Sequence, residues 1–290
     1  MHTFRKHGSP AAIATEATSL RWLAEAVPDG GAPVVPLLTT GGGWLETEYL
    51  AAGRPSAADA EEFGRRLAVT HAAGAGWWGA PPPGLEARDS RLAELDQPVF
   101  ASPAEAPGTW GEFYAEHRVR PYVRMGADAA ELSGRQVEVV ERALARIGLG
   151  EFDVPQPVGC PPVARVHGDL WGGNVLWAAA GDGSGGAGPD GGADGAGRSG
   201  GGRGGVSGVV GTLIDPAAHG GHAETDLAEL ALFGSPHLEQ TRAGYDEVAP
   251  LADVWRERVA LHQMHMLAVH VALFGGGYGA QLAAAAARYT

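Results

Sequence analysis

The segment His167–Asn174, with the sequence His-Gly-Asp-Leu-Trp-Gly-Gly-Asn, constrains this chain more than any other part of it. It places Asp169 five residues before Asn174, and a second aspartate, Asp215, follows at the end of an apolar run. A carboxylate can accept a proton from a hydroxyl group, and Asn and Asp oxygens are hard ligands that suit magnesium. The spacing therefore predicts a loop that directs a base at an acceptor oxygen and an amide at a metal ion.

This arrangement resembles the catalytic loop of protein kinases, in which His-x-Asp is followed by an Asn five positions after the Asp and by a separate metal-binding Asp. Two further features are more particular: Trp171 after Asp-Leu, and the run Gly220–Asp226 after Asp215. They resemble the fructosamine/ketosamine kinase family, which is related to the aminoglycoside phosphotransferases. The resemblance can be followed from about Phe4 to the C-terminus, and it implies an α+β, protein-kinase-like two-lobe fold.

The resemblance divides the chain near residue 50. Residues 1–50 would form part of a small N-lobe sheet, and residues 51–290 a mainly helical C-lobe with the catalytic loop and the metal Asp. Family members carry about two strands and a Gly-rich loop before the ATP lysine, whereas five residues precede Lys6. We therefore expect a truncated N-lobe. A misassigned start site, a natural truncation and a degenerate pseudokinase are three explanations, and the intact candidate site favours the first.

Residues 181–208 have a different composition from the rest, because 15 of these 28 positions are glycine. Such a run buries too little apolar surface to offset its ordering entropy, so a flexible loop is predicted. Without it, Asn174 and Asp215 are separated by the length of a short hairpin. Its strands would be Val175–Trp177 and Val209–Ile214. A phosphate-binding glycine loop is the alternative, but no Gly-Lys-Ser/Thr follows.

Lys6 is the single lysine among 21 basic residues, which suggests a specific role. A helix is predicted at 12–26, with Glu16, Leu20 and Leu23 on one face. A carboxylate on a core-facing surface requires a cation, for which Lys6 is the candidate. The resemblance gives this pair the role of binding the α- and β-phosphates of ATP. The alternative is two solvated side chains.

Strand periodicity at residues 34–38 and 44–50 leads into a predicted hinge. The resemblance places the backbone groups that bind adenine at Glu48, Tyr49 and Leu50. Helices are predicted at about 109–126 and 133–148, so most of the later chain is helical.

The resemblance assigns the roles within the site. Asp169 would be the general base that orients the acceptor hydroxyl, and Asn174 and Asp215 would bind Mg²⁺. The simpler alternative for both aspartates is a structural role in a turn. His167 is expected to stabilise the catalytic loop.

Four further residues are expected to lie around these catalytic and metal-binding residues. Trp171 is predicted either to form a wall for a sugar or to pack in the core. By resemblance, Asp226 would brace the catalytic loop through its backbone N–H groups. His222 and Glu224 would face the substrate.

Composition excludes several classes of partner. A net charge of −13 argues against nucleic acid and anionic membranes, although it allows ATP, which requires a few local cations. Cys160 is the single cysteine, so an intrachain disulfide is excluded and a reducing compartment is expected. The first residues lack an apolar signal-peptide core. A cytoplasmic enzyme without a membrane span is predicted, and its histidines show no zinc-ligand spacing.

The predicted function is ATP- and Mg²⁺-dependent phosphorylation of the 3-hydroxyl of a small or protein-bound ketosamine, which would lead to deglycation. One alternative is a kinase for an aminoglycoside or a choline-like amine. The other is a catalytically silent nucleotide-binding protein.

Overall fold

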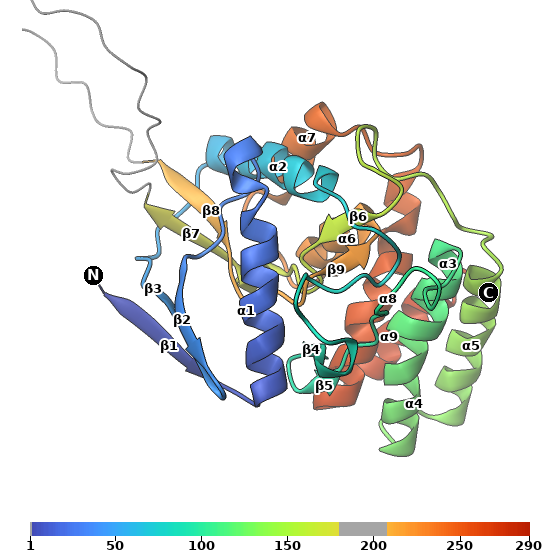
Figure 1. Cartoon of the computed structure of the whole chain (residues 1–290). Coiled ribbons are helices and arrows are strands. Elements are labelled where there is room, and N and C mark those ends of the chain that lie inside the picture. The colour runs from blue at the N-terminus through green and yellow to red at the C-terminus, as the bar shows by residue number, and fades with distance from the viewer. Residues whose placement is uncertain (1, 180–207) are drawn as a thin grey trace, which may run out of the picture.

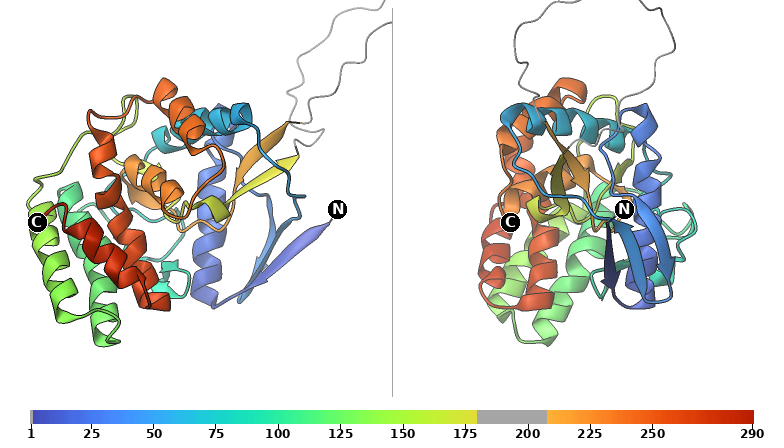
Figure 2. Two further views of the ribbon diagram at one scale, coloured as in Figure 1. Left: turned by 180° about the vertical axis from the view of Figure 1, so that it is seen from behind. Right: turned by 90° about the vertical axis from the view of Figure 1, so that its left-hand side faces the viewer.

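The computed structural model describes residues 2–179 and 208–290. The glycine-rich insert predicted at 181–208 lies, except for Gly208, outside the described residues. Figure 1 shows a small group of strands and one helix on the N-terminal side and a larger, mainly helical part on the other. The view from behind in Figure 2 gives the same division, with the two chain ends on opposite sides.

The N-terminal strands form an antiparallel sheet in the order β1-β3-β2. The strands are β1 (Thr3–His7), β2 (Leu37–Gly41) and β3 (Trp44–Glu48). Helix α1 (Pro10–Ala24) packs against β2 and β3. Its N-terminus is fixed by the Ser9 hydroxyl, which accepts a hydrogen bond from the Ala12 N–H, and by Pro10 in the first turn.

The strand predicted at 34–38 begins later than expected. Pro33 and Pro36 lack N–H donors, so this segment cannot complete a regular ladder with β3. Val34 instead forms an isolated bridge with Leu213, next to a hydrogen bond from the Leu213 N–H to the Pro33 carbonyl. The proline-rich segment thereby connects the N-terminal sheet to the end of β8 (Val209–Leu213).

The larger part is built from helices around two apolar clusters. The helices are α2 (Ala57–Ala72), α3 (Trp110–Phe113), α4 (Arg120–Asp128), α5 (Gly134–Gly148), α6 (Ala223–Leu232), α7 (Leu238–Val248), α8 (Trp255–Phe274) and α9 (Tyr278–Ala286). The helix predicted at 133–148 is present as α5. None of the described helices is long and apolar enough to cross a bilayer.

The helix predicted at 109–126 is interrupted. A π-helical turn at Tyr114–Val119 separates α3 from α4. Pro121 follows this turn, and its ring nitrogen cannot donate to an earlier carbonyl, so the regular α-helical ladder is broken here. The turn directs the Arg118 side chain into the interior, where the residue is 2% exposed.

Two antiparallel, two-stranded sheets position the candidate catalytic loop. β6 (Ala164–Val166) pairs with β9 (His219–Gly221), and β7 (Val175–Ala179) pairs with β8. The loop at 167–174 connects β6 to β7, and residues 214–218 connect β8 to β9. The two connections lie together, because the Ile214 N–H donates to the Asn174 carbonyl and the Ala217 N–H to the His167 carbonyl. Two smaller strands, β4 (Arg91–Leu92) and β5 (Leu95–Asp96), form a separate hairpin.

Helices α2 and α7 approach closely through glycine. A Cβ on Gly244 would collide with the backbone carbonyl of Glu61, and one on Gly64 would collide with that of Thr241. We therefore expect Gly244→Ala to destabilise the fold by about 1–3 kcal/mol and to lower Tm by roughly 3–10 °C.

Gly134→Ala is the matched control, because nothing lies within 4 Å of a Cβ at this helix N-terminus. Thermal unfolding followed by circular dichroism measures both variants. An equal Tm for Gly244→Ala and the wild type would contradict the close contact.

Candidate active site

Two adjoining pockets lie between the N-terminal sheet and the catalytic loop. The first, of about 350 Å³, is largely apolar and lies between β3 and the β7–β8 hairpin. The second, of about 380 Å³, is more polar and contains the candidate catalytic residues. Glu16 and Asp215 line both pockets, so they mark the junction. The polar pocket is lined by Lys6, Glu16, Asp169, Trp171, Asn174 and Asp215, together with residues of α1 and the β4–β5 hairpin.

Lys6 bridges two carboxylates at this junction. Its Nζ lies 2.8 Å from Glu16 Oε2 and 3.2 Å from Asp215 Oδ1. Burial alone would lower the pKa of Lys6, but Asp215 and Glu16 outweigh it and raise that pKa, so the ammonium is charged. Burial raises the pKa of Glu16 to about 7 despite the opposing effect of Lys6, and the nearby Asp215 charge adds to the rise. The structure therefore brings the predicted lysine and glutamate together.

Asp169 and Asn174 are joined within the catalytic loop. The Asn174 Nδ2 donates to the Asp169 carboxylate over 2.9 Å and to its carbonyl over 2.8 Å. This leaves the side-chain oxygen Oδ1 of Asn174 without a donor among the described residues. Burial raises the pKa of Asp169 to about 7, and the nearby Asp215 charge adds to this effect. A carboxylate poised near neutrality is suited to take a proton from a hydroxyl.

Asp215 presents its carboxylate to the pocket from a strained backbone. Its φ of 53° lies in the left-handed region that residues other than glycine rarely adopt, and Pro216 follows it. The side chain is 43% exposed, so its oxygens are accessible. With the Asn174 amide oxygen, it offers the hard oxygen ligands that Mg²⁺ prefers. The residues present therefore fit a magnesium site.

The predicted hinge residues Glu48, Tyr49 and Leu50 line the apolar pocket. The Glu48 N–H donates to the Pro36 carbonyl over 3.0 Å, and the Tyr49 N–H donates to the His2 carbonyl over 2.9 Å. Leu50 follows these two engaged residues, and its N–H finds no acceptor in the described part of the chain. Leu50 is thus the one of the three whose N–H can bind a base in the pocket.

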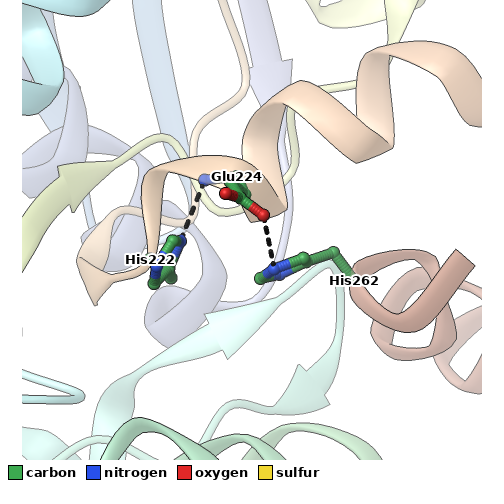
Figure 3. A group of neighbouring side chains, drawn as sticks. All are labelled: His222, Glu224 and His262. Atoms are coloured by element: carbon green, nitrogen blue, oxygen red, sulfur yellow. Dashed lines mark hydrogen bonds and ion pairs between the residues drawn. The ribbon is translucent and has the colours of Figure 1, made fainter. Parts of the chain in front are cut away.

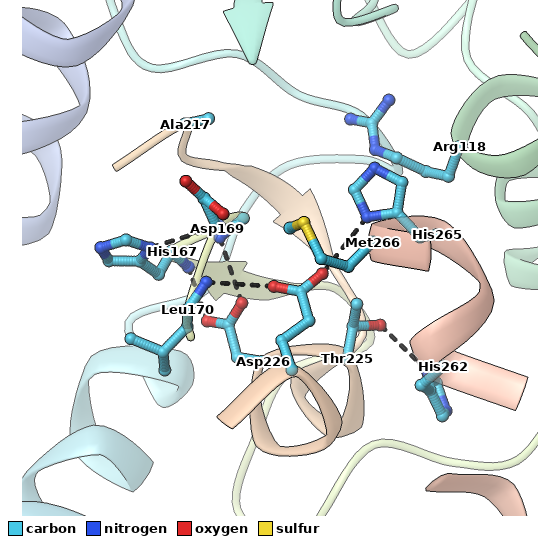
Figure 4. Close-up of polar contacts among 12 residues, drawn as sticks. Arg118, His167, Asp169, Leu170, Ala217, Thr225, Asp226, His262, His265 and Met266 are labelled. Carbon is cyan, nitrogen blue, oxygen red and sulfur yellow. Dashed lines mark hydrogen bonds and ion pairs between the residues drawn. The ribbon is translucent and has the colours of Figure 1, made fainter. Parts of the chain in front are cut away.

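Helix α6 holds the catalytic loop in place through hydrogen bonds (Figure 4). Asp226 accepts hydrogen bonds from the His167 N–H over 2.7 Å and the Gly168 N–H over 3.1 Å. The His71 Nε2 lies 3.0 Å from the same carboxylate. Glu229 accepts the Leu170 N–H over 3.0 Å. The contact of Asp226 with the loop is the one that the family resemblance implies, whereas the sequence pattern did not indicate that Glu229 would bind the loop.

His167 is a structural member of the loop in this geometry. Its Nε2 donates to the Ile214 carbonyl over 3.0 Å, and its Nδ1 accepts the Asp169 N–H over 3.3 Å. Burial lowers its pKa, so the neutral imidazole bridges the catalytic loop to the segment before Asp215. Trp171 lines the polar pocket, is 38% exposed and meets Phe233 edge-on, which places it at the pocket wall and not in the core.

The prediction that His222 and Glu224 face the substrate is wrong in this structure. Both are buried and lie in the C-terminal core, outside the lining of the two pockets described above (Figure 3). Glu224 binds Arg258, which donates over 2.8 Å from Nε and 2.5 Å from Nη2. Burial alone would raise the pKa of Glu224, but the neighbouring His262 ring and the Arg258 guanidinium lower it to about 2. The physical reason is that the buried Arg258 guanidinium on α8 binds this carboxylate.

His222, Glu224 and His262 lie close enough to resemble a metal site. However, the His222 Nδ1 already accepts the Glu224 N–H over 3.2 Å, and Arg258 occupies the carboxylate. Burial lowers the pKa of His222 to about 3, which agrees with a neutral ring that is hydrogen-bonded at Nδ1. The His222 Nδ1 and the Glu224 carboxylate are therefore already engaged, and the Glu224–Arg258 pair joins α6 to α8.

The gathering of Asp169, Asn174, Asp215 and Lys6 at one cleft is the arrangement expected of a phosphotransferase of the protein-kinase-like class. Residues 4–289 match the fructosamine kinase family model, and the chain belongs to this family. A crystal structure from Thermobifida fusca, assigned as a fructosamine-3-kinase, is 35% identical with a TM-score of 0.77, covering 99% of this chain and 85% of that one. A structure from Haemophilus somnus, 15% identical with a TM-score of 0.67 over 98% of this chain and 82% of that one, supports the fold alone.

Relatives assigned as ketoamine kinases include one from Synechocystis, 27% identical over 265 residues, and YniA of Escherichia coli, 28% identical over 236 residues. The matches cover 86% and 80% of this chain but 68% and 64% of those relatives, so the chain spans about two thirds of their length. The predicted α+β, kinase-like fold and the family are thus confirmed.

The raised pKa values of Asp169 and Glu16 predict that the nucleotide-free protein loses stability as pH rises. The folded state binds more protons than the unfolded state between the ordinary carboxyl pKa, near 4, and about 7, so this stabilising contribution is complete at low pH and is lost through pH 7. Asp169→Asn should therefore raise Tm at pH 8 by a few degrees, corresponding to about 1–3 kcal/mol. The gain should shrink at pH 5.

The exposed Asp128→Asn serves as the control, because its effect should be the same at both pH values. Scanning calorimetry without nucleotide or metal measures the difference. A gain for Asp169→Asn that is equal at pH 5 and pH 8 would contradict the buried, raised carboxyl.

Proposed function

We propose that this chain is an ATP-dependent kinase that phosphorylates the 3-hydroxyl of ketosamines. The observation that carries the proposal is the joint position of Asp169, Asn174, Asp215 and Lys6 at one cleft in a member of the fructosamine kinase family. Deglycation in the cytoplasm would be its role, and the ketosamine could be free or protein-bound. The boundary near residue 50 would separate an ATP-binding lobe, 1–50, from a catalytic lobe, 51–290.

The acceptor hydroxyl would lie between Asp169 and Trp171. Its oxygen attacks the γ-phosphorus of ATP as the bond from that phosphorus to the β,γ-bridging oxygen breaks, and ADP leaves. The hydroxyl proton passes to the Asp169 carboxylate. Because phosphoryl transfer requires little covalent participation by the protein, the main contributions are alignment and charge neutralisation.

The ATP side would use the apolar pocket and the ion-pair junction. Adenine would lie between Leu45 and Ile214, with the Leu50 N–H at the rim. Lys6 would bind the α- and β-phosphates, held in place by Glu16. Asn174 and Asp215 would hold Mg²⁺, which neutralises charge on the phosphates.

An ADP-release assay tests the reaction directly. We expect turnover on fructosamine-, ribulosamine- or erythrulosamine-type adducts and none on aminoglycosides or choline. Asp169→Asn should lower kcat by about 10²–10⁴-fold while leaving ATP affinity nearly unchanged, because the variant loses the proton acceptor and keeps the loop. Turnover confined to an aminoglycoside would refute the ketosamine substrate, and full activity of Asp169→Asn would remove this residue from its role.

Lys6→Met should raise the KM for ATP by about 10- to 100-fold, because a hydrogen bond to a charged group contributes about 1.5–3 kcal/mol. The neighbouring Arg5→Met is the matched control. Arg5 is on the same strand but pairs with Glu46 and lies 4.2 Å from the Trp44 ring centroid, so its loss should leave the KM unchanged. Steady-state kinetics at varied ATP measures both. Equal KM values for the two variants would contradict the assignment of Lys6.

A further inference from the structure

Helix α6 presents two buried carboxyl groups to the catalytic loop from adjacent turns. Asp226 and Glu229 are three positions apart, so their side chains leave the same face of the helix. Both residues are 0% exposed. Together they accept the N–H groups of His167, Gly168 and Leu170, which immediately surround Asp169 (Figure 4).

The two carboxyl groups differ in their partners. Asp226 accepts two backbone N–H groups and the His71 Nε2, which together stabilise a negative charge. Glu229 accepts one backbone N–H, and its other oxygen lies 3.3 Å from the His265 Nδ1. Among the described residues, no Lys or Arg forms an ion pair with Glu229. A buried carboxyl without a cation normally becomes neutral instead of holding its charge.

The charged and titratable groups around Glu229 reinforce this difference. Asp226 on the same helix and Asp169 in the loop are acidic, whereas Arg118 lines the small cavity that Glu229 and His265 share. Burial raises the pKa of Glu229 well above its ordinary value, and the neighbouring Asp226 and Asp169 charges raise it further against the weaker influence of Arg118.

The His265 ring is suited to accept a hydrogen bond from the Glu229 carboxylic acid. Its pKa is lowered to about 3 by burial and by Arg118, so its ring is neutral. The ring lies on α8, and its Nδ1 faces the Glu229 oxygen that does not bind the loop.

We propose that Glu229 is a positioning residue that acts as a neutral carboxylic acid, with its carbonyl oxygen accepting the Leu170 N–H and its hydroxyl donating to the His265 Nδ1. The carboxyl thereby ties the catalytic loop to α8. It does so without adding a second negative charge beneath Asp169. The effect on catalysis rests on the proposed kinase function, whereas the protonation state does not.

The kinetic test compares three substitutions. Glu229→Gln reproduces a neutral acid, since its amide can accept from Leu170 and donate to His265, and should keep kcat within about threefold of the wild type. Glu229→Leu removes both bonds and should lower kcat by about 10- to 100-fold with little change in the KM for ATP, because the base loses its orientation. Asp226→Asn should be strongly damaging, because its carboxylate is needed as an acceptor of three donors.

The exposed Glu138→Gln on α5 is the matched surface control. Equal losses of kcat for Glu229→Gln and Glu229→Leu would show that a charged carboxylate is required and would overturn the proposal. An unchanged kcat for Glu229→Leu would overturn the positioning role. If Glu229→Leu does not fold, the comparison of Glu229→Gln with Asp226→Asn still decides.

Infrared spectroscopy tests the protonation state without any substrate. At pH 7.5 the difference spectrum of wild type minus Glu229→Gln should contain the carbonyl stretch of a protonated carboxylic acid, because the contributions of Asp169 and Glu16 are common to both proteins and cancel. The difference spectrum of wild type minus Glu138→Gln should lack this band. The absence of this difference would refute the neutral acid even if the enzyme is active. Conversely, its presence together with no turnover on any ketosamine would leave the neutral acid established and would refute the proposed kinase function instead.

Discussion

The hydrogen bonds from the His167 and Gly168 N–H groups to Asp226 fix the catalytic loop, and the rest of the site depends on the position of this loop. The catalytic loop connects two short two-stranded sheets, so its own strands offer few backbone partners for its N–H groups. Each buried N–H left unpaired would cost about 1–3 kcal/mol. Asp226 removes this cost and is itself fixed by His71 of α2. Asp169, the proposed base, is thus positioned by two helices that contribute no residue to the lining of the polar pocket.

The carboxyl groups of the site fall into two classes because their environments differ. Burial alone would raise the pKa of Asp226, but His71, His167 and the backbone N–H groups hold it below its ordinary value. Asp169 and Glu16 have fewer such partners, and burial raises the pKa of each to about 7. Groups with lowered pKa values support the structure through a permanent charge. Carboxyl groups whose pKa lies near 7 are those that can exchange protons or respond to a bound phosphate.

The sequence predicted the loop containing Asp169 because the chemistry of that site depends on residues close together in the chain, and the structure has them at one cleft. It also predicted the meeting of Lys6 with Glu16, since a charged group on an apolar helix face requires a partner. It did not predict that Arg258 binds Glu224 or that Glu229 supports the loop. Those contacts join α6 to distant segments, and helical periodicity shows that a residue is buried without showing which partner it meets.

Asp215 lies between Lys6 and the catalytic loop, and the proposed reaction would change its contact with Lys6. Its Oδ1 lies 3.2 Å from the Lys6 Nζ, and it is also one of the two residues proposed to offer oxygens to Mg²⁺. Binding of a metal–nucleotide complex would give Lys6 the phosphate oxygens in place of Asp215 and would free the aspartate for the metal. Glu16, which shares Lys6, keeps the lysine in position during this exchange.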